Sequence, residues 1–112
     1  MFKDDLVKVL NVIHLVDPQN ITFPLIYDKE FEQYSISEMD LSTRSENALR
    51  RNKIHSMGDL INNMDSLSKM RNCGRKSEVE IRNKFLETWY ENISQEQSSE
   101  FWEKFVETNA VA

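Results

Sequence analysis

The sequence predicts an all-α fold, a compact bundle of short helices. Only two Gly and two Pro occur in 112 residues, which disfavours a turn-rich β sandwich or barrel. Apolar residues recur at three- and four-residue steps along several segments, as they do on one face of a helix. Hydrophobic residues make up 39% of the sequence and charged residues 29%, a balance typical of a globular domain rather than a disordered segment.

The first predicted helix runs from Lys3 to Val16 and ends before Pro18, which cannot continue a helix. Its apolar stripe consists of Leu6, Val9, Leu10, Ile13 and Val16. Residues 21–27 are expected to be irregular or briefly extended, and residues 28–34 to form a short helical turn.

Polar capping residues mark the helices that follow. Ser42 is expected to cap a helix over residues 43–51, and Ser56 a helix that begins directly after it. A short turn capped by Asp65 or Ser66 comes next.

The last two predicted helices follow a glycine-containing loop at 72–77. One helix opens from this loop, with a wide apolar stripe that several neighbours would cover. Ser94 and Gln97 fit a capping box for the other, over about Gln95 to Thr108.

The charge of the sequence is unevenly distributed. The net charge is −5, which by itself argues weakly against a nucleic-acid partner. Residues 36–85, however, hold ten basic and seven acidic residues, a net of +3, and the remainder holds four basic and twelve acidic residues, a net of −8. A basic middle between acidic flanks is therefore compatible with a nucleic-acid partner.

Several function classes are disfavoured by composition. One Cys excludes an internal disulfide framework, and one Cys with two well-separated His leaves no usual zinc-ligand set, so no metal or cofactor is expected. No apolar run approaches the roughly 20 residues that span a bilayer. The first ten residues carry acids where a signal peptide needs basic residues, so a cytoplasmic location is predicted.

The loop at Gly74 is the first candidate binding feature. Gly74 is followed by Arg75, Lys76 and Ser77 at a predicted helix start. Free backbone N–H groups and positive side chains in one place suit a phosphate oxygen. Ordinary turn geometry is the simpler explanation of the glycine, and the loop is too short for a P-loop.

The second candidate feature is the pair Arg44 and Asn47, three residues apart and so on one helix face. Arg can supply charge in a DNA groove, and Asn can bond base edges or sugars. A solvated first turn is the simpler alternative.

Taken together, these features resemble the C-terminal domain of the bacterial RNA polymerase alpha subunit, over about residues 36–86. The matching blocks are 40–49, 54–60, and 72–77 with Glu80 and Ile81. The resemblance implies a bundle of short helices with a helix–hairpin–helix element. It also implies docking on the minor groove of A·T-rich duplex DNA near promoters, with contacts to sigma factors and other transcription regulators.

The resemblance also implies roles for individual residues. Arg44 resembles the arginine that enters the groove, Asn47 resembles its partner, and Ala48 stands where the family often has Cys. The second DNA-contacting cluster resembles Gly74, Arg75, Lys76, Ser77 and Glu80. Asp40 resembles the acid that faces sigma, although a lone acid before a helix is more often a cap or a solvated charge. Glu78 stands where the family has an apolar residue, and the stretch between Met64 and Met70 is one residue short.

The protein is predicted to be a single domain over 1–112, with an N-terminal helical extension (1–35), the core (36–86) and a C-terminal helical extension (87–112). A complete alpha subunit carries an assembly domain that 35 residues cannot hold, so a stand-alone alpha-C-terminal-like protein is expected. The predicted function is non-enzymatic DNA binding linked to transcription. The alternative is a protein-interaction module that binds a transcription factor or other regulator without binding DNA. The sequence does not indicate an oligomeric state.

Overall fold

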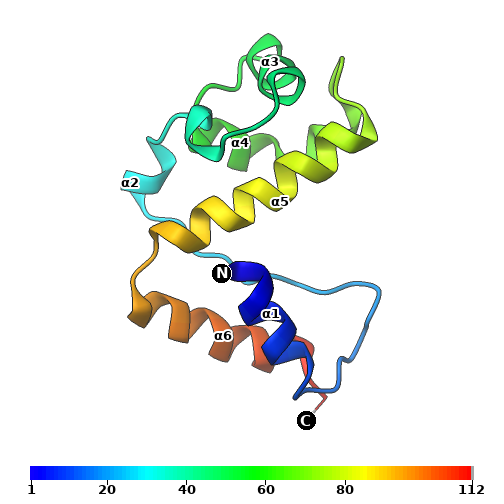
Figure 1. Ribbon diagram of the computed structural model, residues 1–112, viewed down its shortest axis with the longest axis vertical. Helices are drawn as coiled ribbons and strands as arrows, with labels where there is room; N and C mark the ends of the chain where they lie inside the picture. The colour runs from blue at the N-terminus through cyan, green and yellow to red at the C-terminus, as the bar shows by residue number, and fades with distance from the viewer. Residues whose placement is uncertain (112) are drawn as a thin grey trace. The chain divides into compact units, whose positions relative to one another are not determined.

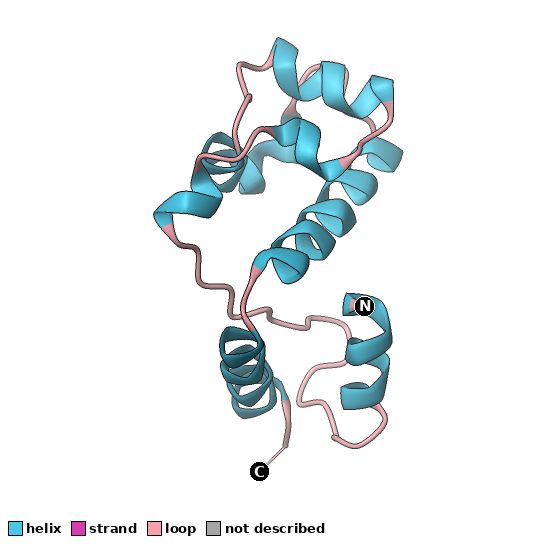
Figure 2. Ribbon diagram, turned by 60° about the vertical axis from the view of Figure 1, so that its left-hand side comes forward, coloured by secondary structure: helices cyan, strands magenta, loops and turns pink. Residues whose placement is uncertain are grey.

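The computed structural model describes residues 1–111, and this part of the protein is built from helices joined by loops (Figures 1 and 2). The elements in order are α1 (Phe2–Leu10), α2 (Lys29–Glu32), η1 (Ile36–Met39), α3 (Thr43–Arg51), α4 (Met57–Asn63), η2 (Met64–Lys69), α5 (Arg75–Asn92) and α6 (Gln95–Asn109). Within residues 1–111 the only β pairing consists of two isolated bridges. The prediction of an all-α bundle of short helices is confirmed.

The protein divides into two compact units. The central unit comprises Tyr27–Trp89, and the terminal unit combines Met1–Ile26 with Tyr90–Ala112. The boundary between them falls inside the residue range of α5. The description of the protein as one domain with two extensions stays a prediction.

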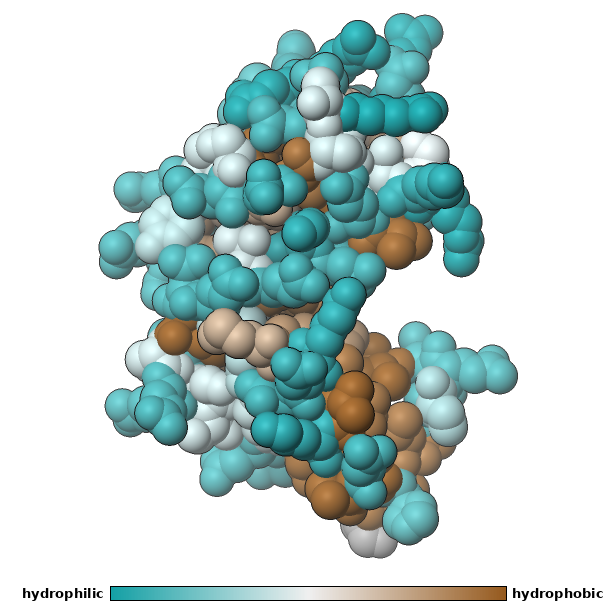
Figure 3. Space-filling view, in the orientation of Figure 1, coloured by the Kyte–Doolittle hydropathy of each residue, from teal (hydrophilic) through white to brown (hydrophobic). Residues whose placement is uncertain are grey.

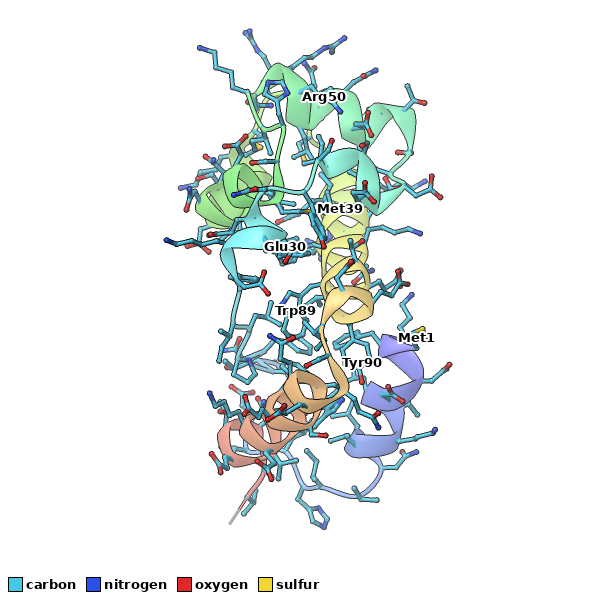
Figure 4. The ribbon with its side chains drawn as sticks, turned by 90° about the vertical axis from the view of Figure 1, so that its left-hand side faces the viewer. Met1, Glu30, Met39, Arg50, Trp89 and Tyr90 are labelled. Carbon is cyan, nitrogen blue, oxygen red and sulfur yellow. The ribbon has the colours of Figure 1, made fainter. Side chains whose placement is uncertain are left out.

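The core of the central unit gathers aliphatic side chains around the first half of α5. Its fully buried members include Ile36, Met39, Leu49, Ile54, Met57, Leu60, Leu67, Ile81 and Phe85, with Met39 seen on the inner side of its 3-10 helix in Figure 4. Aromatic rings close one side of this core, because Phe85 packs edge-on against both Tyr27 and Phe31.

The helix starts of the central unit follow the predicted caps. Ser42 Oγ accepts the backbone N–H of Ser45, so α3 begins at Thr43 and spans the predicted residues. Ser56 and Asp59 form a reciprocal capping box at the start of α4. The predicted cap at Asp65 or Ser66 is wrong, because η2 follows α4 without a break and already begins at Met64.

An aromatic cluster joins α1 to α6 within the terminal unit. Phe2, Phe23, Tyr90, Phe101, Trp102 and Phe105 pack ring against ring. The hydroxyl of Tyr90, which is labelled in Figure 4, donates to Asp5 Oδ2 at 2.7 Å and accepts from Trp102 Nε1 at 2.9 Å. The predicted capping box of Ser94 and Gln97 is confirmed and starts α6 at Gln95.

The predicted first helix is wrong at its C-terminal end. Helix α1 ends at Leu10, and Val16 is exposed rather than part of a buried stripe. Residues 14–16 instead pair with the last residue of α6 and the segment after it. Val16 N–H donates to the Asn109 carbonyl at 2.8 Å, and Val111 N–H donates to the His14 carbonyl at 2.7 Å. These long-range bonds satisfy backbone groups of residues 14–16 that have no partners within a helix.

Candidate nucleic-acid interface

Helix α3 presents the first pair of predicted residues to solvent. Arg44 and Asn47 both lie on its outer face, and both are exposed. Ala48, which follows Asn47, is buried and belongs to the inner face of the same helix. The amphipathic pattern of α3 therefore leaves the Arg44 and Asn47 side chains available to a ligand, whereas Ala48 packs inside the protein.

The second predicted cluster lies where the loop after η2 enters α5 (Figure 1). Gly74, Arg75 and Lys76 are exposed, while Ser77 is buried. The backbone of Gly74 does not have a positive φ, and a Cβ built on it meets no atom within 4 Å. Neither a positive φ nor a close neighbour therefore requires glycine at position 74. The missing side chain leaves open space beside the backbone.

Arg44 and the second cluster line one groove, whereas Asn47 is not among the residues of that groove. Its walls are formed by Ser42, Arg44 and Ser45 from the start of α3, and by Gly74, Arg75, Lys76, Ser77 and Glu80 from the start of α5. The structure thus brings together residues that lie some thirty positions apart in the sequence. Asp40 is exposed in a left-handed conformation (φ 52°) just after η1 and is not among the residues of this groove.

A second groove adjoins the first and shares Arg44 with it. It is lined by Arg44, Asn47, Ala48, Arg51 and Asn72. Arg51 and Asn72 were not predicted as site residues. The signal for Arg51 was its spacing of seven from Arg44, which returns to nearly the same helix face.

Glu80 holds the N-terminal end of α3 against α5. Its carboxylate accepts the Ser42 backbone N–H at 2.9 Å, the Ser42 hydroxyl at 2.8 Å and the hydroxyl of Ser45. The Ser45 hydroxyl, followed by the Ser42 backbone N–H, lowers the pKa of Glu80 below its ordinary value. The negative charge is thus bound to donors of the protein, and Glu80 connects the start of α3, which carries Arg44, to α5, which carries Lys76.

Asn52 forms the corresponding connection at the other end of α3. Its Nδ2 donates to the Ala48 carbonyl at 2.7 Å and to the Arg71 carbonyl at 3.3 Å. The next residue after Arg71, Asn72, adopts φ 64°, a left-handed conformation that Asn tolerates better than most residues. Asn52 therefore holds the loop before α5 close to α3, and with it the wall of the second groove.

The cations of this region fall into two sets. Arg50 pairs with Glu46 at 3.2 Å, and Arg82 pairs with Glu78 at 3.2 Å. In contrast, no hydrogen bond or ion pair to another part of residues 1–111 engages the side chains that line the grooves: Arg44, Arg51, Arg75 and Lys76. The grooves therefore carry four positive side chains that are available to an anionic ligand.

Two further findings concern residues 1–111 alone. They contain no cluster of three or more His, Cys, Asp or Glu side chains arranged to hold a metal ion. In the same range, no helix is both long and apolar enough to cross a membrane.

The fold and the grooves define a small all-helical module with a cation-lined face. The model of the family formed by the C-terminal domain of the bacterial RNA polymerase alpha subunit matches residues 27–87. The protein belongs to this family, and the resemblance inferred from its motifs is confirmed. It is a transcription-related domain of the kind that forms part of bacterial RNA polymerase.

Curated relatives support this assignment. The protein is 36% identical over 89 residues to the DNA-directed RNA polymerase subunit alpha of Syntrophomonas wolfei, with 73% of this protein and 28% of the relative covered. Subunits of the same name from Cyanophora paradoxa and Roseiflexus sp. (strain RS-1) are 42% identical over 55 residues and 41% identical over 76 residues, covering 48% and 65% of this protein. The matches span only 18% and 22% of those two relatives. No solved structure matches the sequence significantly.

Proposed function

We propose that this protein is a non-enzymatic DNA-binding module of bacterial transcription that docks on the minor groove of A·T-rich duplex DNA, in the cytoplasm. The observation that carries the proposal is the single groove that joins Arg44 to the Gly74–Ser77 segment. A shared groove whose cations have no partners within residues 1–111 suits a polyanion.

The physical chemistry of such docking assigns a role to each half. The narrow minor groove of an A-tract has an enhanced negative potential that attracts an inserted arginine, and Arg44 is exposed and has no ion-pair partner within residues 1–111. Asn47 lies one turn further along the same face and can bond to base edges or sugars. Lys76, Arg75 and the N–H groups at the start of α5 would hold phosphates.

Gly74 supports the same interpretation. No described residue would contact a Cβ at this position, so the absence of a side chain serves no internal packing. A phosphate could approach the backbone closely there, as glycine allows.

The test is fluorescence anisotropy with an A-tract duplex and a G·C-rich duplex across a salt series. The wild type should prefer the A-tract, and Arg44→Ala should lose about 1–3 kcal/mol of binding free energy on it. Lys76→Ala should lower the affinity for both duplexes alike and reduce the slope of log affinity against log salt by about one. Equal A-tract affinity of wild type and Arg44→Ala would overturn the groove role of Arg44.

A sigma contact through Asp40 is also proposed, because this acid is exposed and does not line the groove. Asp40→Asn should weaken binding of a purified sigma factor in surface plasmon resonance and leave DNA affinity unchanged. Unaltered sigma binding would remove Asp40 from that role.

A second candidate function is a protein-interaction module, favoured by the surface of the terminal unit. This unit has three basic and eight acidic residues. It also exposes apolar side chains at Val7, Val12, Val16 and Val111, and Figure 3 shows apolar surface over α1 and the segment near it. Exposed apolar area within an acidic surface suits a partner that offers apolar side chains flanked by Lys and Arg.

The double variant Val12→Ser, Val16→Ser tests this candidate, because both side chains are mostly exposed, at 80% and 65%, and their loss should spare the fold. If the candidate is correct, the intact protein binds neither duplex but binds purified sigma factor or core polymerase, and the double variant binds it less. Binding of the polymerase proteins that the double variant leaves unchanged would remove this surface from the interaction.

A further inference from the structure

The second groove extends the proposed DNA site toward the C-terminal end of α3. We propose that Arg51 forms an additional contact with a DNA backbone phosphate, beyond the contacts made by Arg44 and by the loop that opens α5. The inference rests on the proposed function, because it enlarges the same interface.

The spacing along α3 places Arg51 beyond the reach of the minor groove when Arg44 occupies it. Seven residues of α-helix rise about 10 Å and return to within about 20° of the same face. The minor groove of B-DNA is only about 6 Å wide. In a docking that places α3 across the groove, with Arg44 inside it, Arg51 would stand over the sugar–phosphate backbone that borders the groove.

The electrostatic state of Arg51 differs from that of its neighbour. The Arg50 guanidinium pairs with Glu46 and also lies 3.4 Å from Nδ1 of His55; Arg50 is labelled in Figure 4. Arg51 is exposed, and no hydrogen bond or ion pair to any other residue of the described range engages its side chain. Of two consecutive arginines, only the second is left for an external anion.

The wall opposite Arg51 is held in place from within the protein. Asn52 bonds both Ala48 and the Arg71 carbonyl, so the loop that carries Asn72 is connected to α3. Asn72 is exposed and lines the groove together with Arg44, Asn47 and Arg51. No carboxylate of the described residues lines this groove.

The chemistry of the groove suits a phosphate. A guanidinium offers paired N–H donors that match phosphate oxygens, and the Asn72 amide adds a neutral donor. Contacts to phosphates hold the register of a protein on the duplex and carry no sequence information of their own. Arg51 should therefore raise affinity for every duplex to the same degree.

The experiment compares wild type, Arg51→Ala and the matched control Arg50→Ala, which removes the same charge one residue away on the same helix. Anisotropy is measured on the A-tract and G·C-rich duplexes across a salt series, and circular dichroism confirms that each variant is folded. Arg51→Ala should lower the affinity for both duplexes by a similar factor, about five- to tenfold. It should also reduce the slope of log affinity against log salt by about one. Arg50→Ala should change the affinity for each duplex, and the salt slope, by less than half as much.

A second variant tests the opposite wall. Asn72→Gly removes the amide while keeping a residue that accepts positive φ. It should lower the affinity for both duplexes by a smaller factor than Arg51→Ala does. The salt slope should stay nearly unchanged, because no charge is lost.

Each outcome separates this inference from the proposed function. Absence of A-tract binding by the wild type would overturn both. Wild-type binding with Arg51→Ala unchanged, or weakened no more than Arg50→Ala, would overturn the inference alone. A loss confined to the A-tract would also overturn it, since Arg51 would then read the groove rather than the backbone.

Discussion

The central and terminal units differ in how their charges are used. The central unit has eleven basic and eleven acidic residues, so its net charge is zero, whereas the terminal unit has three basic and eight acidic residues. The neutral unit nevertheless offers the cationic grooves, because several of its acids are bound internally: Glu46 to Arg50, Glu78 to Arg82 and Glu80 to two serines. In the central unit, the internal partners of the acidic side chains, rather than the net charge, therefore leave a positively charged surface at the grooves.

The two units also differ in their cores. The central core is largely aliphatic and is closed by Phe85 against Tyr27 and Phe31. The terminal core is an aromatic cluster in which Phe105 packs against Phe23 and Trp102. Phe85 and Phe105 are both buried, at 2% and 0% exposure. Replacing each in turn therefore disturbs one unit at a time and shows which unit DNA binding depends on.

The largest expected effects come from Phe85→Ala and Phe105→Ala. Each should lower the free energy of unfolding by about 3–5 kcal/mol, because truncation of a buried Phe leaves a cavity. Urea unfolding followed by circular dichroism measures the loss. Phe85→Ala should also abolish A-tract binding, since it disturbs the unit that carries both grooves, while Phe105→Ala should leave binding nearly intact.

One outcome would contradict this division of roles. If Phe105→Ala retained its helix content but lost DNA binding, the terminal unit would be part of the interface.

A smaller effect is expected from the helix caps Ser42 and Ser94. Both side chains accept a backbone N–H at the start of a helix, and loss of such a cap costs about 1 kcal/mol. Ser42→Ala should cost more, about 2 kcal/mol in all, because its hydroxyl also donates to Glu80. Only Ser42→Ala should reduce A-tract affinity, since it releases the start of α3.

Thermal unfolding and anisotropy on the two variants check this prediction. A Ser42→Ala variant as stable as Ser94→Ala, with undiminished DNA affinity, would show that the Glu80 contact does not position Arg44.

The smallest effect on stability is expected from Gly74→Ala. The added methyl group meets open space, and φ is not positive, so the free energy of unfolding should change by less than about 0.5 kcal/mol. A-tract affinity should nevertheless fall, because the methyl group would stand where a phosphate approaches the backbone. Gly58→Ala is the control: its Cβ would lie 3.1 Å from the Glu32 carbonyl oxygen, so it should lower stability more than Gly74→Ala does. Undiminished DNA affinity in Gly74→Ala would exclude close approach at this loop.

Local chemistry determined much of this protein directly from the sequence. The span of α3 and the starts of α4 and α6 were predictable, because a capping serine acts on N–H groups two or three residues away. The family was also predictable, since its motif residues keep their order and nearly the family's spacing along the sequence, and the family model matches residues 27–87. Arg44, Asn47 and the Gly74–Ser77 segment could therefore be named as candidates from the residues alone.

Only the tertiary structure decided how distant segments meet. Helix α1 stops at Leu10 and residues 14–16 find backbone partners near residue 110, and no local pattern encodes a partner some 95 positions away. The same applies to the grooves: Glu80 and Asn52 connect α3 to the 71–80 segment through contacts that lie 19 to 38 residues apart. Arg50 and Arg51 are adjacent and identical in type, yet within residues 1–111 one has an ion-pair partner and the other has none. The geometry of the folded protein, not residue identity, determines which acids lie within reach of each.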